Sequence, residues 1–111
     1  MATVRKILGQ LAPAAATLEV AYTVPADTEA VVSSIMCCNQ ATSTDTFSVA
    51  IVSAADATPA PANIIYYNIP IGGNNTFVAT VGITMAAGDM VYVYSNAGGM
   101  GFSVFGQEIS V

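Results

Sequence analysis

The chain has 111 residues, of which 54% are hydrophobic and 8% are charged, against about 25% charged residues in average soluble domains. This length predicts one domain over residues 1–111. The net charge is −5, and the only cations are Arg5 and Lys6. Nucleic-acid binding needs many phosphate contacts from such side chains, so it is excluded as a function.

Ionised side chains are too scarce to cover the exterior of a lone domain. Alanine, threonine, serine and asparagine must supply much of the surface, and the usual protection against aggregation by mixed charges is nearly missing. We therefore expect part of the exterior to pack against other protein subunits. The alternative is a monomer with a neutral surface rich in alanine and threonine.

The mean hydropathy is positive, but the sequence does not predict a membrane span. Residues 57–88 carry no charge, yet prolines, glycines and asparagines divide them, and no run of about 18 apolar residues exists. The first residues place a basic pair before an apolar stretch, as secretion leaders do. Because Gly9 and Pro13 interrupt that stretch, we expect no leader.

Alternation of apolar with polar or small residues predicts strands along the first half of the chain. The first is expected at residues 4–8, within a candidate amino-terminal arm at 1–16, and the second at 17–24. Residues 29–39 carry apolar side chains on both faces, which predicts a central strand covered on both sides. Residues 47–51 are expected to form a hairpin with it.

The second half is expected to continue the same pattern. Residues 54–62 contain two prolines and predict a long crossing loop. A short aromatic strand at 64–68 and a tight turn at 72–75 predict a second hairpin. Further strands are expected at residues 77–81, 90–95 and 102–105. About eight strands and no helix predict an all-β, antiparallel β-sandwich.

Side chains for catalysis or metal binding are scarce. The chain has no histidine, and its closest acidic pair, Asp27 and Glu29, falls far short of a calcium site. Asp89 is expected to cap backbone amides at a turn. Cys37 and Cys38 should point to opposite faces of a strand, which prevents a bridge between them, and they lack further zinc ligands. We expect no enzyme activity, cofactor, metal or small-molecule substrate.

The best candidates for contacts with a partner are four tyrosines that could lie on a surface, Tyr66, Tyr67, Tyr92 and Tyr94. Their flat, amphipathic rings anchor interfaces well and also stack on sugars, although they pack equally well inside a sandwich. The basic pair and the two apolar residues after it, on the candidate arm, are the other choice. The expected interface residues are Arg5, Lys6, Ile7, Leu8, Tyr66, Tyr92 and Tyr94.

Residues 83–93 (ITMAAGDMVYV) resemble a late strand junction of jelly-roll domains. Complement-collagen heads and tumour-necrosis-factor-like domains have a similar apolar stretch with Gly-Asp before a strand, and a segment such as 102–105 then closes their sheet. Those domains are trimers. The resemblance implies a jelly-roll sandwich that assembles as a homotrimer.

The whole chain also resembles small virion proteins of tailed bacteriophages. The stretches that carry this resemblance are 7–10 (ILGQ), 22–25 (YTVP), 32–35 (VSSI), 38–39 (CN), 65–67 (IYY), 75–77 (NTF) and 105–108 (FGQE). The resemblance implies a virion protein made in the host cytoplasm, a capsid decoration or cement protein that binds the major capsid protein. The alternatives are a tail, baseplate or fibre subunit, or a carbohydrate- or receptor-binding module that uses the tyrosines.

Overall fold

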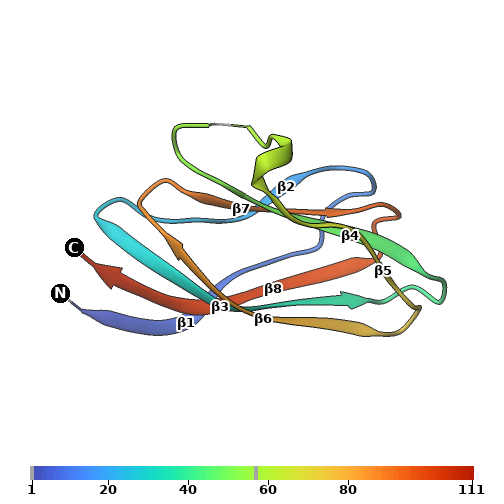
Figure 1. The fold of residues 1–111 in the computed structure, drawn as a ribbon. Coiled ribbons are helices and arrows are strands. Elements are labelled where there is room, and N and C mark those ends of the chain that lie inside the picture. The colour runs from blue at the N-terminus through green and yellow to red at the C-terminus, as the bar shows by residue number, and fades with distance from the viewer. Residues whose placement is uncertain (1, 57) are drawn as a thin grey trace.

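The structure, a computed structural model, describes residues 2–56 and 58–111 and consists of strands and one short 3₁₀ helix (Figure 1). The elements are β1 (Thr3–Leu11), β2 (Glu19–Thr23), β3 (Thr28–Asn39), β4 (Asp45–Val52), η1 (Pro61–Asn63), β5 (Ile64–Ile71), β6 (Thr76–Met85), β7 (Met90–Ser95) and β8 (Met100–Ser110). All the predicted strands are present, because alternation of side chains is a strong local signal.

The strands form two antiparallel sheets of four that lie face to face (Figure 1). Sheet A has the order β1-β8-β3-β6, and sheet B has the order β2-β7-β4-β5. Every connection except that between β4 and β5 crosses from one sheet to the other. This order is that of a jelly roll, so the predicted all-β, antiparallel sandwich of jelly-roll type is confirmed.

Both predicted hairpins are wrong. The strands at 29–39 and 47–51 belong to β3 and β4, which lie in opposite sheets, and the strands on either side of 72–75 are also divided between the sheets. A periodicity of two identifies a strand but not the strand that it pairs with. The turns after β3 and after β5 therefore connect one sheet to the other and do not close hairpins.

The long loop predicted at 54–62 does not cross between the sheets. Its described residues belong to the β4–β5 loop (residues 53–56 and 58–63), which joins two neighbouring strands of sheet B and rises over the outer face of that sheet (Figure 1). Residue 57 of the predicted loop lies outside the described residues. Strand β3 is central, as predicted, between β8 and β6. Only its inner face is covered within the described residues, since Met36 on the other face is 39% exposed.

Most of the candidate amino-terminal arm lies within a sheet. Residues 3–11 form β1, which pairs with β8 from Thr3 opposite Ile109 to Leu11 opposite Phe102. The ends of the described chain are side by side, because the Ser110 amide donates to the Ala2 carbonyl at 2.9 Å. The segment 12–18 then leads from β1 in sheet A to β2 in sheet B.

The core lies between the sheets and is built around aromatic rings. The Phe47 ring centroid lies 5.2 Å from that of Phe77, 6.0 Å from that of Phe102 and 6.2 Å from that of Tyr66. Valines from both sheets extend this cluster, and the most buried of them are Val32, Val49, Val91, Val93 and Val104. Burial of each such side chain contributes roughly 1.5–3 kcal/mol to folding.

Two buried polar side chains hold the turns at the end of the sandwich opposite the chain termini. The Asn39 side-chain amide donates to the carbonyls of Ser43 and Ile71 at 3.0 and 3.1 Å. Asp45 is 5% exposed. It accepts hydrogen bonds from the Ser95 hydroxyl at 2.9 Å and the Ala97 amide at 3.1 Å. Asn39 thereby holds the β3–β4 turn and the end of β5, and Asp45 holds the β7–β8 turn.

Replacement of Asp45 tests this role. Asp45→Ala leaves a buried hydroxyl and a backbone amide without their acceptor, so we expect the free energy of unfolding in urea to fall by roughly 1–3 kcal/mol. The matched control is Glu29→Ala, which removes an exposed carboxylate without a side-chain hydrogen bond among the described residues and should change stability by less than about 0.5 kcal/mol. Equal losses in the two variants would contradict the role of Asp45.

Candidate interaction surfaces

Residues with acid–base or metal-binding chemistry do not gather in one place. No group of three or more His, Cys, Asp or Glu side chains in the described part of the chain is arranged to hold a metal ion. Asp89 caps a turn as predicted, since its carboxylate accepts hydrogen bonds from the amides of Ala54 and Ala86 at 3.0 and 2.8 Å. Within residues 2–56 and 58–111, no helix is long and apolar enough to cross a membrane.

The adjacent cysteines occupy different environments. Cys37 lies in the core with its Sγ 3.2 Å from the Sδ of Met100, and Cys38 is half-buried on the opposite face of β3. Both thiols are free, as the alternation along a strand predicts. Burial, followed by the nearby Cys38 and Asp45, raises the pKa of the Cys37 thiol to about 12.

The four candidate residues at the amino end do not form one patch. Ile7 is 53% exposed on the outer face of sheet A, where it pairs with Phe105, and Arg5 lies on the same face. Lys6 turns the other way and contacts Glu108, while Leu8 packs against the core. The alternation of β1 separates them.

The candidate tyrosines also divide between the two faces of sheet B. Tyr66 points inward and packs against Phe47 and Phe77, which agrees with the alternative of an internal ring. Tyr92 and Tyr94 are half-buried on the outer face of sheet B, where they pair with Ala50 and Ser48.

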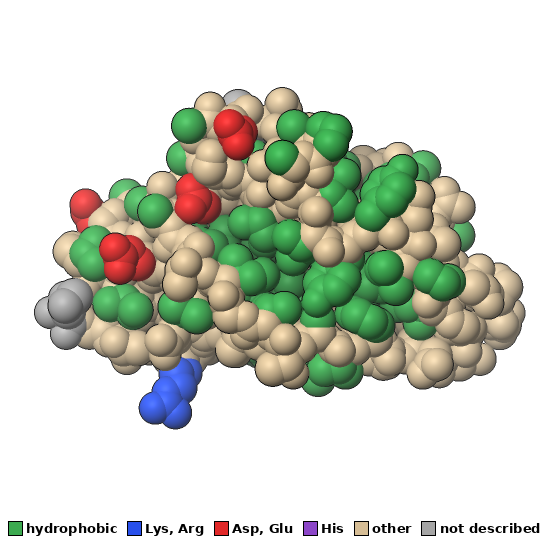
Figure 2. Space-filling model, in the orientation of Figure 1, with side chains coloured by type: hydrophobic (Ala, Val, Ile, Leu, Met, Phe, Trp, Pro, Cys, Tyr) green, Lys and Arg blue, Asp and Glu red, His purple; other side chains and the backbone are tan. Residues whose placement is uncertain are grey.

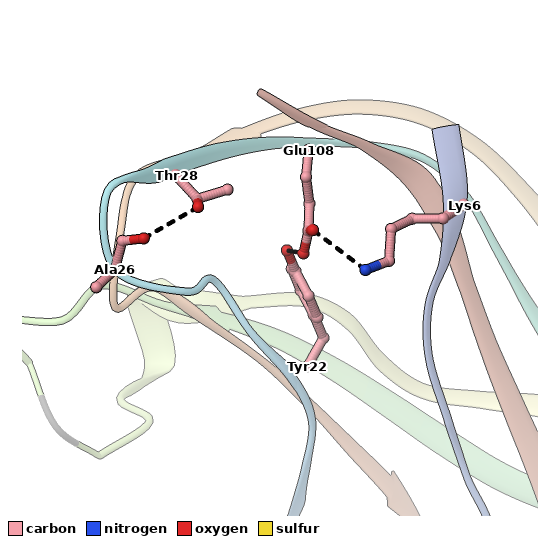
Figure 3. Close-up of polar contacts among 5 residues, drawn as sticks. All are labelled: Lys6, Tyr22, Ala26, Thr28 and Glu108. Carbon is pink, nitrogen blue, oxygen red and sulfur yellow. Dashed lines mark hydrogen bonds and ion pairs between the residues drawn. The ribbon is translucent and has the colours of Figure 1, made fainter. Parts of the chain in front are cut away.

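A polar contact ties the sheets together on the side where β1 and β2 are the edge strands (Figure 3). The Tyr22 hydroxyl donates to Glu108 Oε2 at 2.6 Å, and Lys6 Nζ lies 3.2 Å from Glu108 Oε1. The backbones are so close here that any side chain at Gly9 would collide with the carbonyl oxygen of Ala21. We call this the closed side.

The same contact shifts two pKa values in opposite directions. Burial and the hydrogen bond to Glu108 raise the pKa of Tyr22 above its ordinary value. The hydrogen bond from Tyr22 outweighs burial and, with the charge of Lys6, holds the pKa of Glu108 below its ordinary value of 4.5. The deprotonated carboxylate and the protonated phenol therefore stabilise the folded state together.

The opposite side of the sandwich is apolar. Here β5 and β6 are the edge strands, and Figure 2 shows hydrophobic side chains gathered between the two sheets, with the visible carboxylates in the half of the view nearer the chain termini. We call this the open side. Half-buried hydrophobic residues of the strands that border it are Ile51, Tyr66, Ile69, Phe77, Val81 and Ile83.

Strand β6 is the least protected edge strand of the molecule. It has 10 residues, contains neither proline nor a charged residue, and alternates between exposed and inward-facing side chains along its whole length. Strand β6 has one register shift, where Val81 and Gly82 stand opposite Ser33 of β3. The other edge strands are blocked more strongly: β1 has two cations, β2 has only 5 residues, and β5 contains Pro70. Such features prevent unwanted pairing of strands, so β6 is the edge that remains free to pair.

The outer face of sheet A continues the apolar surface beyond β6. Ile7, Met36 and Val78 are 53%, 39% and 52% exposed, and Phe105 is half-buried between them. No other element covers this face among the described residues. Sheet A therefore presents exposed apolar side chains on its outer face and an uncharged, proline-free edge, which meet at β6.

The outer face of sheet B is hollowed by a groove of about 560 Å³. Tyr67 and Tyr94 line it together with Leu18, Asn68 and Asn96, and Pro59 of the β4–β5 loop contributes to its rim. Tyr94 was among the candidate residues. Tyr67 was one of the tyrosines expected to be available at a surface, whereas Leu18 and the two asparagines were not candidates.

No protein-family model matches the chain, and no curated protein sequence matches it significantly.

The closed side predicts a specific response to acid. A carboxyl group with a lowered pKa in the folded state contributes stability above pH 4.5, and this contribution is lost as the pH falls through the folded-state pKa. Tyr22→Phe removes the principal hydrogen bond to Glu108, so its melting temperature should fall less between pH 7 and pH 3 than that of the wild type. Tyr67→Phe, at an exposed position, is the control and should follow the wild type; equal losses in all three proteins would contradict the coupling.

The two thiols should differ in reactivity. A disulfide reagent at pH 8 should modify Cys38 quickly in the folded protein and Cys37 only after unfolding in urea, because the core both hides Cys37 and keeps it protonated. The folded Cys38→Ser variant should therefore show no fast-reacting thiol. Rapid reaction of Cys37 in that variant would show that the core opens readily at this point.

Proposed function

We propose that this chain is a structural protein of a bacteriophage virion, a decoration protein that binds the major capsid protein and cements the assembled shell. The observation that carries the proposal is the uncharged, proline-free β6 edge between the apolar open side and the exposed apolar side chains on the outer face of sheet A. The resemblance to small virion proteins supports the location in a virion. The β6 edge and the apolar surfaces beside it support binding to neighbouring subunits.

Edge pairing and apolar contact reinforce each other at β6. The outer edge of this strand offers unpaired N–H and C=O groups that a strand of a neighbouring subunit can pair with. Exposed Val78 and half-buried Phe77 lie on the two faces of the same strand, so a subunit that pairs here also covers apolar surface. Burial of that surface contributes about 25 cal/mol per Å² before the costs of association.

Stabilisation of a shell requires no chemical step. A protein that binds the assembled shell, and not its separated subunits, shifts the equilibrium toward the shell by mass action. The scarcity of charge suits this role, because a surface with few ions loses little hydration when a neighbour covers it.

The proposal includes a homotrimer. In a closed ring each subunit contributes two different surfaces to its neighbours. The open side and the outer face of sheet A are two different apolar surfaces on one chain, which supports a contact of this kind. A trimer also matches the symmetry of a threefold position on a shell. The alternative position is in the tail, baseplate or fibre, with fewer copies per particle.

A lysine in the middle of β6 tests the proposal. Thr80 is exposed at the centre of this strand, and Thr80→Lys adds a charge that a neighbouring apolar strand cannot accept. We expect the wild type to elute as a trimer and to bind purified phage shells. The variant should elute as a monomer and bind at least about tenfold more weakly, with an unchanged melting temperature.

Thr44→Lys is the matched control, since it adds the same charge at an exposed turn position outside β6. It should retain both the trimer and shell binding. A wild-type protein that stays monomeric at high concentration and binds neither shells nor tails would overturn the proposal. Density for the subunit in a particle map that is confined to the tail would overturn the capsid position.

A further inference from the structure

We propose that the groove on the outer face of sheet B is a binding site for an uncharged sugar ring. The groove lies on the sheet that does not contain β6, so this inference goes beyond the assembly role and stands independently of it. Its volume of about 560 Å³ falls within the roughly 300–1,000 Å³ that is typical of small-ligand sites.

A bulge in β5 builds one wall of the groove. Phe47 pairs with Ile69 and Val49 with Tyr66, so two residues of β5, Tyr67 and Asn68, stand opposite Ser48 alone. The Asn68 backbone has a positive φ of 48°, and its amide donates to the Ser48 hydroxyl at 3.0 Å. The extra residue places the side chains of both Tyr67 and Asn68 along the outer face, where they line the groove. Bulges often redirect side chains in this way beside functional sites.

Small residues form the floor, and a second tyrosine forms the other wall. Ser48 and Ala50 of β4 are short, which keeps the floor deep, and Tyr94 stands beside Ser48 on the neighbouring strand β7. Leu18 lines the groove near the start of β2. Two aromatic rings therefore flank a mostly apolar floor.

Unused polar groups line the same groove. The side-chain amides of Asn68 and Asn96 and the hydroxyl of Tyr94 make no hydrogen bond to any described residue, although all three line the groove. Each amide offers both a donor and an acceptor, which is the combination that sugar hydroxyls require. The C–H face of a pyranose ring stacks on a tyrosine ring while its hydroxyls reach the amides.

The charge of the lining selects among ligands. No charged side chain lines the groove within residues 2–56 and 58–111, and the chain as a whole is acidic. A phosphate, a nucleic acid or an acidic sugar would find no cation there and would be repelled at longer range. A neutral hexose or N-acetylhexosamine matches both the neutral amides and the flanking rings.

Ligand-observed NMR on the full-length protein provides the test. The probes are the methyl glycosides of glucose, galactose, mannose and N-acetylglucosamine, with methyl glucuronide as the acidic comparison. We expect at least one neutral glycoside to bind and the glucuronide not to bind. Tyr67→Ala and Asn96→Ala, at two exposed positions, should each weaken binding by roughly two- to tenfold.

Tyr92→Ala is the matched control, because it removes a tyrosine from the same strand as Tyr94 but outside the groove. It should bind the glycoside as the wild type does. Melting temperature and shell binding, measured on every variant, separate loss of the sugar site from unfolding and from failure of the assembly role. No binding of any neutral glycoside, binding of the glucuronide alone, or equal binding by the wild type and Tyr67→Ala would overturn the proposal.

Discussion

Two kinds of polar contact join the sheets of this sandwich: the Glu108 cluster along the side of β1 and β2, and the buried Asn39 amide at the end that holds the β3–β4 and β5–β6 turns. The length of the side between β5 and β6 is left apolar, and the arrangement of the surfaces follows from that. On the closed side, Tyr22 of β2 and Lys6 of β1 meet on Glu108 of β8, and the backbones come into contact at Gly9. On the open side, β5 and β6 face each other with apolar side chains between them. Because the side of β1 and β2 already has its polar partners and the length of the open side does not, we expect the proposed assembly to use the open side.

The distribution of the few charged side chains also leaves much of the surface uncharged. The carboxylates visible in Figure 2 lie in the half of the view nearer the chain termini. At the other end the acidic group of Asp45 is buried and fully used by hydrogen bonds within the fold, as is the amide of Asn39. The outer face of sheet A therefore leads from an end with charged side chains of both signs, Arg5 and Glu29, to a neutral end. A partner with apolar surface meets little competition from hydration over most of that length.

The positions of the strands could be predicted from the sequence far better than which strands pair or which side chains are exposed. Alternation located every strand, but the jelly-roll order pairs residues more than 60 positions apart, such as Cys37 with Phe102, and no local pattern reveals this. The tyrosines show the same limit. Tyr66 was expected at an interface and lies inside, while Tyr67 lines the groove, because a bulge opposite Ser48 sets their directions. Asp45 and Asn39 look like ordinary turn residues until the fold buries them.

The adjacency of Ala2 and Ser110 has a mechanical consequence. A tether attached at either residue would leave the domain from almost the same point, at the end with charged side chains and far from the neutral turns. Tension applied through both ends would separate β1 from β8 by breaking their backbone hydrogen bonds one after another, starting at the termini. It would not load all of these bonds at once, as shear along the strands would. Pulled through its two ends, this domain should therefore yield at low force, whereas a load carried through β6 would cross the full width of sheet A.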